Sequence, residues 1–93
     1  MSSKDISIDV FEILDDRNIK YELNDQSYFD GFDDIYIIKI NQDFTIKLLQ
    51  NVEKINGEYI YDSYTLYFSY SDKDPIYGYD NIIEFIKNST FKN

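Results

Sequence analysis

Two long runs of β-branched and aromatic residues flank an Asn-Gly pair in the middle of the chain. The first run covers residues 44–55, the second covers residues 58–70, and Asn56-Gly57 separates them. A two-residue type I′ turn needs positive φ at both central positions, and Asn followed by Gly meets that need best. The sequence therefore predicts a long β-hairpin, around which the rest of the chain must be arranged.

The two arms of this hairpin do not share one apolar face if their ladder is uninterrupted. Counting outward from the turn places Ile46 opposite Tyr67, so the apolar side chains of the two arms point to opposite faces. A shift of one residue moves every side chain of a strand to the other face. One β-bulge within residues 50–53 or 61–63 would bring Ile46 opposite Phe68. We predict such a bulge; the alternative is an arm broken into two shorter strands.

Residues 35–40 are apolar at almost every position, which is typical of an interior strand. A tight turn at Asn41-Gln42 would pair Ile37 with Ile46 and place Ile35 and Ile37 on the core face. The opposite face would then carry Tyr36, Ile38, Ile40, Leu49, Thr65, Tyr67 and Ser69. We interpret that face as a surface for a partner or for a homodimer. Cover by residues 28–32 or by the C-terminal tail is the alternative.

Helical spacing of apolar residues predicts one helix near each end of the chain. Residues 5–17 carry such a stripe, although a strand is the alternative because residues 6, 8 and 10 also alternate. Residues 80–87 carry a second stripe, with Asp80 as the expected N-cap. Residues 19–23 alternate as a short strand. The predicted fold is α+β: a single domain over residues 1–93, with an N-terminal helix, a four-stranded antiparallel sheet, and a C-terminal helix packed on one sheet face.

The 93 residues carry 18 acidic and 9 basic side chains, a net charge of −9. Such a surface repels nucleic acid and anionic lipid and attracts basic proteins. We see no apolar run long enough to cross a membrane and no signal peptide, so we expect a cytoplasmic protein. The scarcity of Ala, Pro, Gly and Arg indicates an AT-rich coding genome, as in low-GC bacteria and their phages.

The chain offers little chemistry for catalysis. It contains no His and no Cys, which removes the usual general base, thiol nucleophile, and imidazole or thiolate metal ligands. The acids of residues 30–34 do not follow the order of ligands in a calcium-binding loop. We therefore predict a protein that is not an enzyme and that has no cofactor and no metal site.

Tyrosines and acids interleave in the second half of the chain. Tyrosine offers a large contact area with few rotatable bonds, and it is common at the centres of protein interfaces. Aromatic anchors among carboxylates suit a partner with a basic groove, such as a protein that binds nucleic acid. The predicted partner-binding residues are Asp30, Asp33, Asp34, Glu58, Tyr59, Tyr61, Asp62, Tyr67, Asp72, Asp74, Tyr77 and Tyr79.

At the level of its elements, the layout resembles the small type II-A anti-CRISPR proteins of phages. The parts that match are residues 5–17, 35–70 and 80–87. The resemblance implies an acidic single domain that blocks the DNA-binding channel of a Cas effector by nucleic-acid mimicry. We expect such an inhibitor, encoded by a phage or another mobile element and active in the cytoplasm of the host cell.

Two other functions stay open. A bacterial immunity protein is also small and acidic, and it neutralises a basic nuclease toxin by covering the active site. A structural or assembly protein could instead associate with itself through Tyr36, Ile38, Ile40 and Tyr67.

Overall fold

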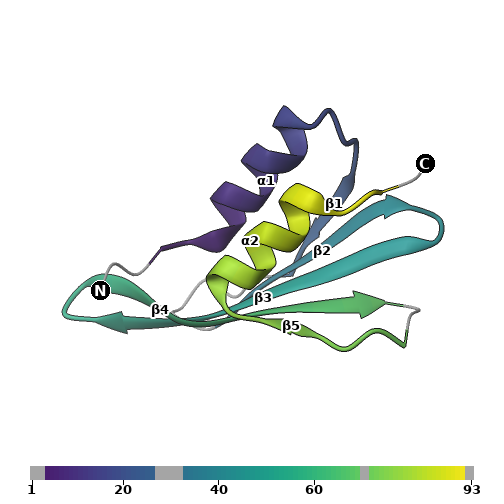
Figure 1. Ribbon diagram of the computed structural model, residues 1–93. Coiled ribbons are helices and arrows are strands. Elements are labelled where there is room, and N and C mark those ends of the chain that lie inside the picture. The colour runs from purple at the N-terminus through teal and green to yellow at the C-terminus, as the bar shows by residue number, and fades with distance from the viewer. Residues whose placement is uncertain (1–3, 27–32, 70–71, 92–93) are drawn as a thin grey trace.

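Two helices pack on one face of a five-stranded antiparallel sheet in the computed structural model, which describes residues 4–26, 33–69 and 72–91 (Figure 1). The strands lie in the sheet in the order in which they occur in the chain. The elements are α1 (Ile6–Asp16), β1 (Glu22–Asp25), β2 (Asp34–Asn41), β3 (Phe44–Ile55), β4 (Glu58–Ser69), β5 (Ile76–Tyr77) and α2 (Tyr79–Asn88). The α+β class is confirmed, but the prediction of four strands missed β5, which is two residues long.

Strands β3 and β4 form the long hairpin, with Ile55 opposite Glu58. Asn56 and Gly57 join them and have φ angles of 52° and 82°. The predicted bulge is confirmed: Asn51 lies opposite Ser63 and Val52 opposite Tyr61, which leaves Asp62 as the extra residue. As a result Ile46 lies opposite Phe68 and Leu48 opposite Leu66, and both arms turn their apolar residues to one face.

The predicted register of β2 is wrong by one residue. The turn lies at Gln42-Asp43, and the ladder shifts between Lys39 and Asn41, so Ile38 rather than Ile37 lies opposite Ile46. The side chain of Asn41 accepts a hydrogen bond from the backbone N–H of Asp43 (2.9 Å), which stabilises the turn at this position. Both Ile38 and Ile40 are therefore buried beneath the helices.

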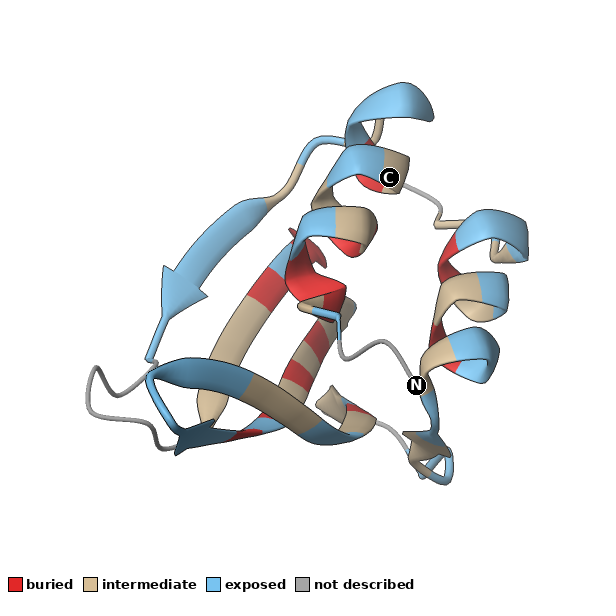
Figure 2. Ribbon diagram, turned by 90° about the vertical axis from the view of Figure 1, so that its left-hand side faces the viewer, coloured by how far each residue is buried: buried red, intermediate tan, exposed pale blue. Residues whose placement is uncertain are grey.

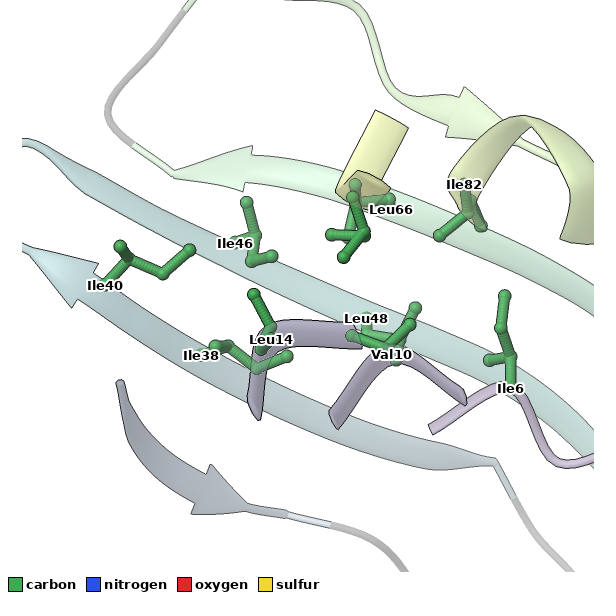
Figure 3. Close-up of a cluster of buried hydrophobic side chains, with 10 residues drawn as sticks. Ile6, Val10, Leu14, Ile38, Ile40, Ile46, Leu48, Leu66 and Ile82 are labelled. Carbon is green, nitrogen blue, oxygen red and sulfur yellow. The ribbon is translucent and has the colours of Figure 1, made fainter. Parts of the chain in front are cut away.

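The core lies between the sheet and the two helices, as the distribution of buried residues shows (Figure 2). Each helix buries one stripe of apolar side chains against the same sheet face. These side chains form one cluster (Figure 3): Ile6, Val10, Leu14, Ile38, Ile40, Ile46, Leu48, Leu66, Ile82 and Ile86. Figure 3 shows the α1 residues of this cluster lying over β2 and β3.

The helix starts differ in how they are capped. Asp5 caps α1 by accepting a hydrogen bond from the backbone N–H of Ser7. At α2 the N-cap is Gly78, with a φ of 94° and no side-chain hydrogen bond. The prediction of Asp80 as the cap is wrong: Asp80 lies in the first turn, where its charge still favours the positive end of the helix dipole.

The sheet face away from the helices, here called the open face, differs from the predicted surface. Because opposed residues share a face, Ile37 joins Lys47 and Tyr67 on it, and Ile35 joins Leu49. Leu49, Thr65, Tyr67 and Ser69 lie on the open face, but the predicted members Tyr36, Ile38 and Ile40 turn to the helices instead. No described helix or strand covers the open face.

The described part of the C-terminal tail, up to Phe91, packs on the helix side and so does not cover the open face. The Phe91 ring lies 4.9 Å from that of Phe44 and 6.0 Å from that of Phe85, centroid to centroid. The Arg17 guanidinium donates 2.6 Å hydrogen bonds to the carbonyls of Ile86 and Ser89. Residues 28–32, the other predicted cover, lie outside the described residues.

The first strand begins later than predicted. Residues Ile19 and Tyr21 precede β1 and pack against the core, and the Tyr21 ring stacks on that of Phe11 with centroids 5.7 Å apart. Leu23 lies opposite Ile38 and so on the helix side of the sheet, yet it is 46% exposed, because β1 is an edge strand.

The end of the hairpin extends past the sheet as a two-stranded ribbon, here called the distal ribbon (residues 51–63). Pairing of β2 with β3 stops at Gln50, and pairing of β5 with β4 stops at Thr65. Within the described residues, the two arms of the ribbon pair only with each other. The molecule is accordingly elongated, 44 × 24 × 23 Å, with the ribbon at its left-hand end in Figure 1.

Neither described helix is long and apolar enough to cross a membrane.

The bulge at Asp62 is the feature that aligns both arms with the core. We predict that inserting one Ala after Asp62 destabilises the protein by about 2–5 kcal/mol, because the bulge accommodates one extra residue and a second one shifts the register and turns the buried Leu66 away from the helices. Urea unfolding followed by circular dichroism measures this. Asp62→Ala keeps the extra residue and should change stability by at most about 0.5 kcal/mol. An insertion variant as stable as the parent would contradict the role of the bulge.

Candidate functional site

The predicted partner-binding residues form separate groups on the structure. Those of the first group, Glu58, Tyr59, Tyr61 and Asp62, lie on the distal ribbon. Tyr59 is 52% exposed, and the Lys54 ammonium lies 5.6 Å from its ring centroid. The large exposed ring is thus placed among charged side chains near the tip of the molecule.

A second group lies at the opposite end of β4. Asp72 and Asp74 are exposed in the connection between β4 and β5, and Tyr67 and Tyr77 are exposed on the open face. Strand β4 spans 12 residues, so its ends are about 37 Å apart at the usual rise per residue. The two groups therefore cannot contact the same small feature of a partner.

The third group lies at the start of β2. Asp33 and Asp34 are half-buried there, and Asp34 is close enough to Tyr61 to affect its ionisation. Two predicted residues join none of these groups. Tyr79 packs against the core, with its hydroxyl buried and without a hydrogen-bond partner among the described residues. Asp30 lies outside the described residues.

A buried glutamine connects the third group to the start of α1. Gln50 is fully buried, and its carbonyl oxygen accepts a hydrogen bond from the backbone N–H of Ile6 (3.0 Å). Its amide nitrogen donates to Asp5 Oδ1 (2.7 Å) and to Asp34 Oδ2 (3.0 Å). One side chain thus holds together α1, β2 and β3. We did not predict this network, although a lone Gln at a core-facing position of β3 is a visible signal.

The surroundings of this network shift the ionisation of its members. Burial raises the pKa of Asp34, and the charges of Asp5, Asp25 and Asp33 raise it further, although the hydrogen bond from Gln50 opposes the shift. Burial, followed by the charges of Asp5 and Asp34, raises the pKa of Tyr61 to about 12. The carboxylates are therefore crowded enough to repel one another.

Tyr64 lies beside this network and makes both a hydrogen bond and a ring contact. The Tyr64 hydroxyl donates a 2.6 Å hydrogen bond to the Lys4 carbonyl, and the Tyr64 ring packs edge-on against that of Tyr79, with centroids 5.3 Å apart. Burial raises the pKa of Tyr64 as well. Tyr64 therefore binds the chain before α1 to β4 and to the start of α2, which is a structural role.

The open face offers a different chemistry from the acidic ends. The Lys47 ammonium lies 5.9 Å from the centroid of the exposed Tyr67 ring. Beside them is a shallow depression of about 580 Å³ whose lining includes Ile37, Lys39 and Glu22. This face combines apolar area with both signs of charge, whereas the ends carry mainly carboxylates. Among the described residues, no group of three or more His, Cys, Asp or Glu is placed to hold a metal ion.

No protein-family model matches the chain, and no curated protein or solved structure is significantly similar to it. Its function must therefore be inferred from its surface: exposed tyrosines beside carboxylates at two separated places, and between them a sheet face that no described helix or strand covers.

The Gln50 network predicts a large loss of stability when its central amide is removed. We expect Gln50→Leu to destabilise the protein by about 2–4 kcal/mol, because the N–H of Ile6 and the carboxylates of Asp5 and Asp34 lose a buried partner. Chemical denaturation measures the change. Gln42→Leu, at an exposed turn position, is the matched control and should shift stability by at most about 0.5 kcal/mol. Equal effects of the two substitutions would show that the network contributes nothing.

The raised pKa of Asp34 predicts a pH-dependent difference between the parent and Asp34→Asn. A carboxyl group whose pKa is higher in the folded state binds its proton more tightly there, so its contribution to stability falls as pH rises through the folded pKa. We expect Asp34→Asn to be more stable than the parent at neutral pH, with the difference closing below about pH 4. Melting temperatures between about pH 3 and 8 test this. Asp43→Asn is the exposed control, and a gap that widens in acid would contradict the sign.

Proposed function

We propose that the protein is a small acidic inhibitor that occupies a basic groove of a nucleic-acid-binding or nuclease protein. The observation that carries this proposal is the pairing of exposed tyrosines with carboxylates: Tyr59 beside Glu58 on the distal ribbon, and Tyr77 near Asp74 in the region of β5. Carboxylates attract a basic groove over long distances, and tyrosines provide contact area once the groove is reached.

Charge alone does not account for such binding. A DNA duplex as long as this molecule, 44 Å, carries about 26 phosphate charges at one per ~1.7 Å, whereas the whole chain has a net charge of −9. A protein with about a third of that charge cannot compete with DNA by electrostatics alone. We therefore assign most of the binding affinity to the exposed tyrosines. We assign the rate and the selectivity of association to the carboxylates.

Mimicry of nucleic acid also fits the shape of the molecule. The elongated body places carboxylates along its length, from Glu58 at the ribbon to Asp72 at the other end of β4. A groove that holds a nucleic acid is itself long, so both ends can contact one such groove. An immunity protein against a nuclease toxin would use the same chemistry, and the identity of the displaced partner separates these two functions.

The test is displacement of DNA from two purified probes, a guide-loaded Cas effector and a nuclease toxin domain. We expect the protein to release a fluorescent duplex from one of them, measured by anisotropy, with an effect that weakens as salt rises from about 0.05 to 0.5 M. The triple variant Asp33→Lys, Asp72→Lys and Asp74→Lys should act more weakly, because three reversals change the net charge by 6, from −9 to −3.

The matched control replaces the same three aspartates by Asn, which removes the charges without adding repulsion. Its effect should lie between those of the parent and the lysine variant. If the duplex stays bound to both probes, or if reversal of the three charges changes neither the affinity nor its salt dependence, the proposal is wrong.

A further inference from the structure

The distal ribbon is unusual because neither of its outer edges pairs with a further strand among the described residues. Residues 51–55 and 58–63 pair with each other, while β2 and β5 end before them. A two-stranded hairpin without further packing is only marginally stable in water. The type I′ geometry at Asn56-Gly57 and the contact of Lys54 with Tyr59 support it from within. Val52 at the base of the ribbon is buried, but residues 53–59 around the turn are all exposed, so the outer part of the ribbon buries little apolar surface.

The exposed side chains of the ribbon are suited to contact with a protein. Ile55 is 46% exposed and Tyr59 is 52% exposed, so two large apolar side chains lie in water next to the turn. Glu53, Glu58 and Asp62 accompany them, against the single base Lys54. Apolar anchors surrounded by charged residues are typical of the centre and rim of an interface.

The charges of the ribbon distinguish between two possible binding partners, a second copy of the chain and a protein with a basic surface. Free strand edges could pair with the same edges of a second copy, but acids on the ribbon and a net charge of −9 on each copy oppose that contact. The same acids favour a basic surface. A ribbon two strands wide is also narrow enough to enter a groove, whereas the body of the sheet is covered by helices on one side.

We infer that the distal ribbon is the arm that enters the basic groove of the partner, with Ile55 and Tyr59 as its apolar anchors. This inference rests on the proposed function, since it names the part of the surface that carries the binding. The bulge at Asp62 contributes by increasing the local twist of the hairpin and thus setting the direction of the ribbon.

A shortened ribbon tests the inference directly. Removal of Glu53, Lys54, Tyr59 and Ile60 deletes two facing pairs and keeps the Asn-Gly turn. Because an even number of positions is lost from each arm, every remaining side chain keeps its face, and no core residue is removed. In the displacement assay with the guide-loaded Cas effector and the nuclease toxin domain, we expect the affinity to fall roughly 30-fold, as for loss of one hot-spot side chain.

Three further variants control for misfolding and for a general effect of charge. Tyr59→Ala keeps the length of the ribbon and should weaken displacement by about 10-fold or more, with an unchanged circular dichroism spectrum. Glu58→Lys with Asp62→Lys changes the net charge by 4, from −9 to −5, and so does Glu12→Lys with Asp16→Lys on the exposed side of α1. The ribbon pair should weaken displacement more than the helix pair.

The outcomes separate the inference from the function on which it rests. If the parent displaces DNA from neither probe, both the proposed function and the inference fail. If the shortened variant displaces DNA as well as the parent, or if the two charge-reversal pairs weaken displacement equally, the protein inhibits but the ribbon is not its arm. If light scattering shows a dimer of the parent that the shortened variant loses, the occupant of the ribbon is a second copy and the inference is wrong.

Discussion

The fold depends on one constraint of β-structure: side chains alternate between the two faces of a strand, so all strands must agree on which residues face the helices. Two irregularities in the ladders bring about this agreement. The register shift near Ile40 sets which residues of β2 face the helices. The bulge at Asp62 does the same for the part of β4 that follows it. With both in place, Ile38, Ile46 and Leu66 lie under the same pair of helices. Without either one, a strand would bury its polar residues.

The sequence predicts those parts of the fold in which the pattern of apolar residues is one-sided. The hairpin arms carry polar residues on one face, so their mismatch across Asn56-Gly57 reveals the bulge. Residues 35–40 are apolar on both faces, so alternation contains no information about their register, and the choice of Ile37 for the core was wrong. The short β5 follows a Pro and has only two residues, too few for any periodic signal.

The candidate site was predicted less well than the fold, because residues that belong to one segment of the sequence can lie far apart along a long strand. Glu58 and Asp72 belong to one tyrosine-rich segment but lie near opposite ends of β4. Conversely, Asp5, Asp34 and Gln50 are far apart in the chain and meet around one buried amide. Such a meeting depends on how the strands pair, which the composition of a segment does not reveal. The distal ribbon is likewise defined by where its neighbouring strands stop.

Arg17, the only arginine of the chain, has a consequence for the order of folding. It links the end of α1 to carbonyls near the end of α2, across 69 and 72 residues of sequence. The hairpins between them join neighbouring segments, whose loops close at low entropic cost. On a ribosome, α1 leaves the exit tunnel before its helical neighbour α2 has been made. The sheet can therefore assemble early, while the helical layer is completed only after α2 has been made.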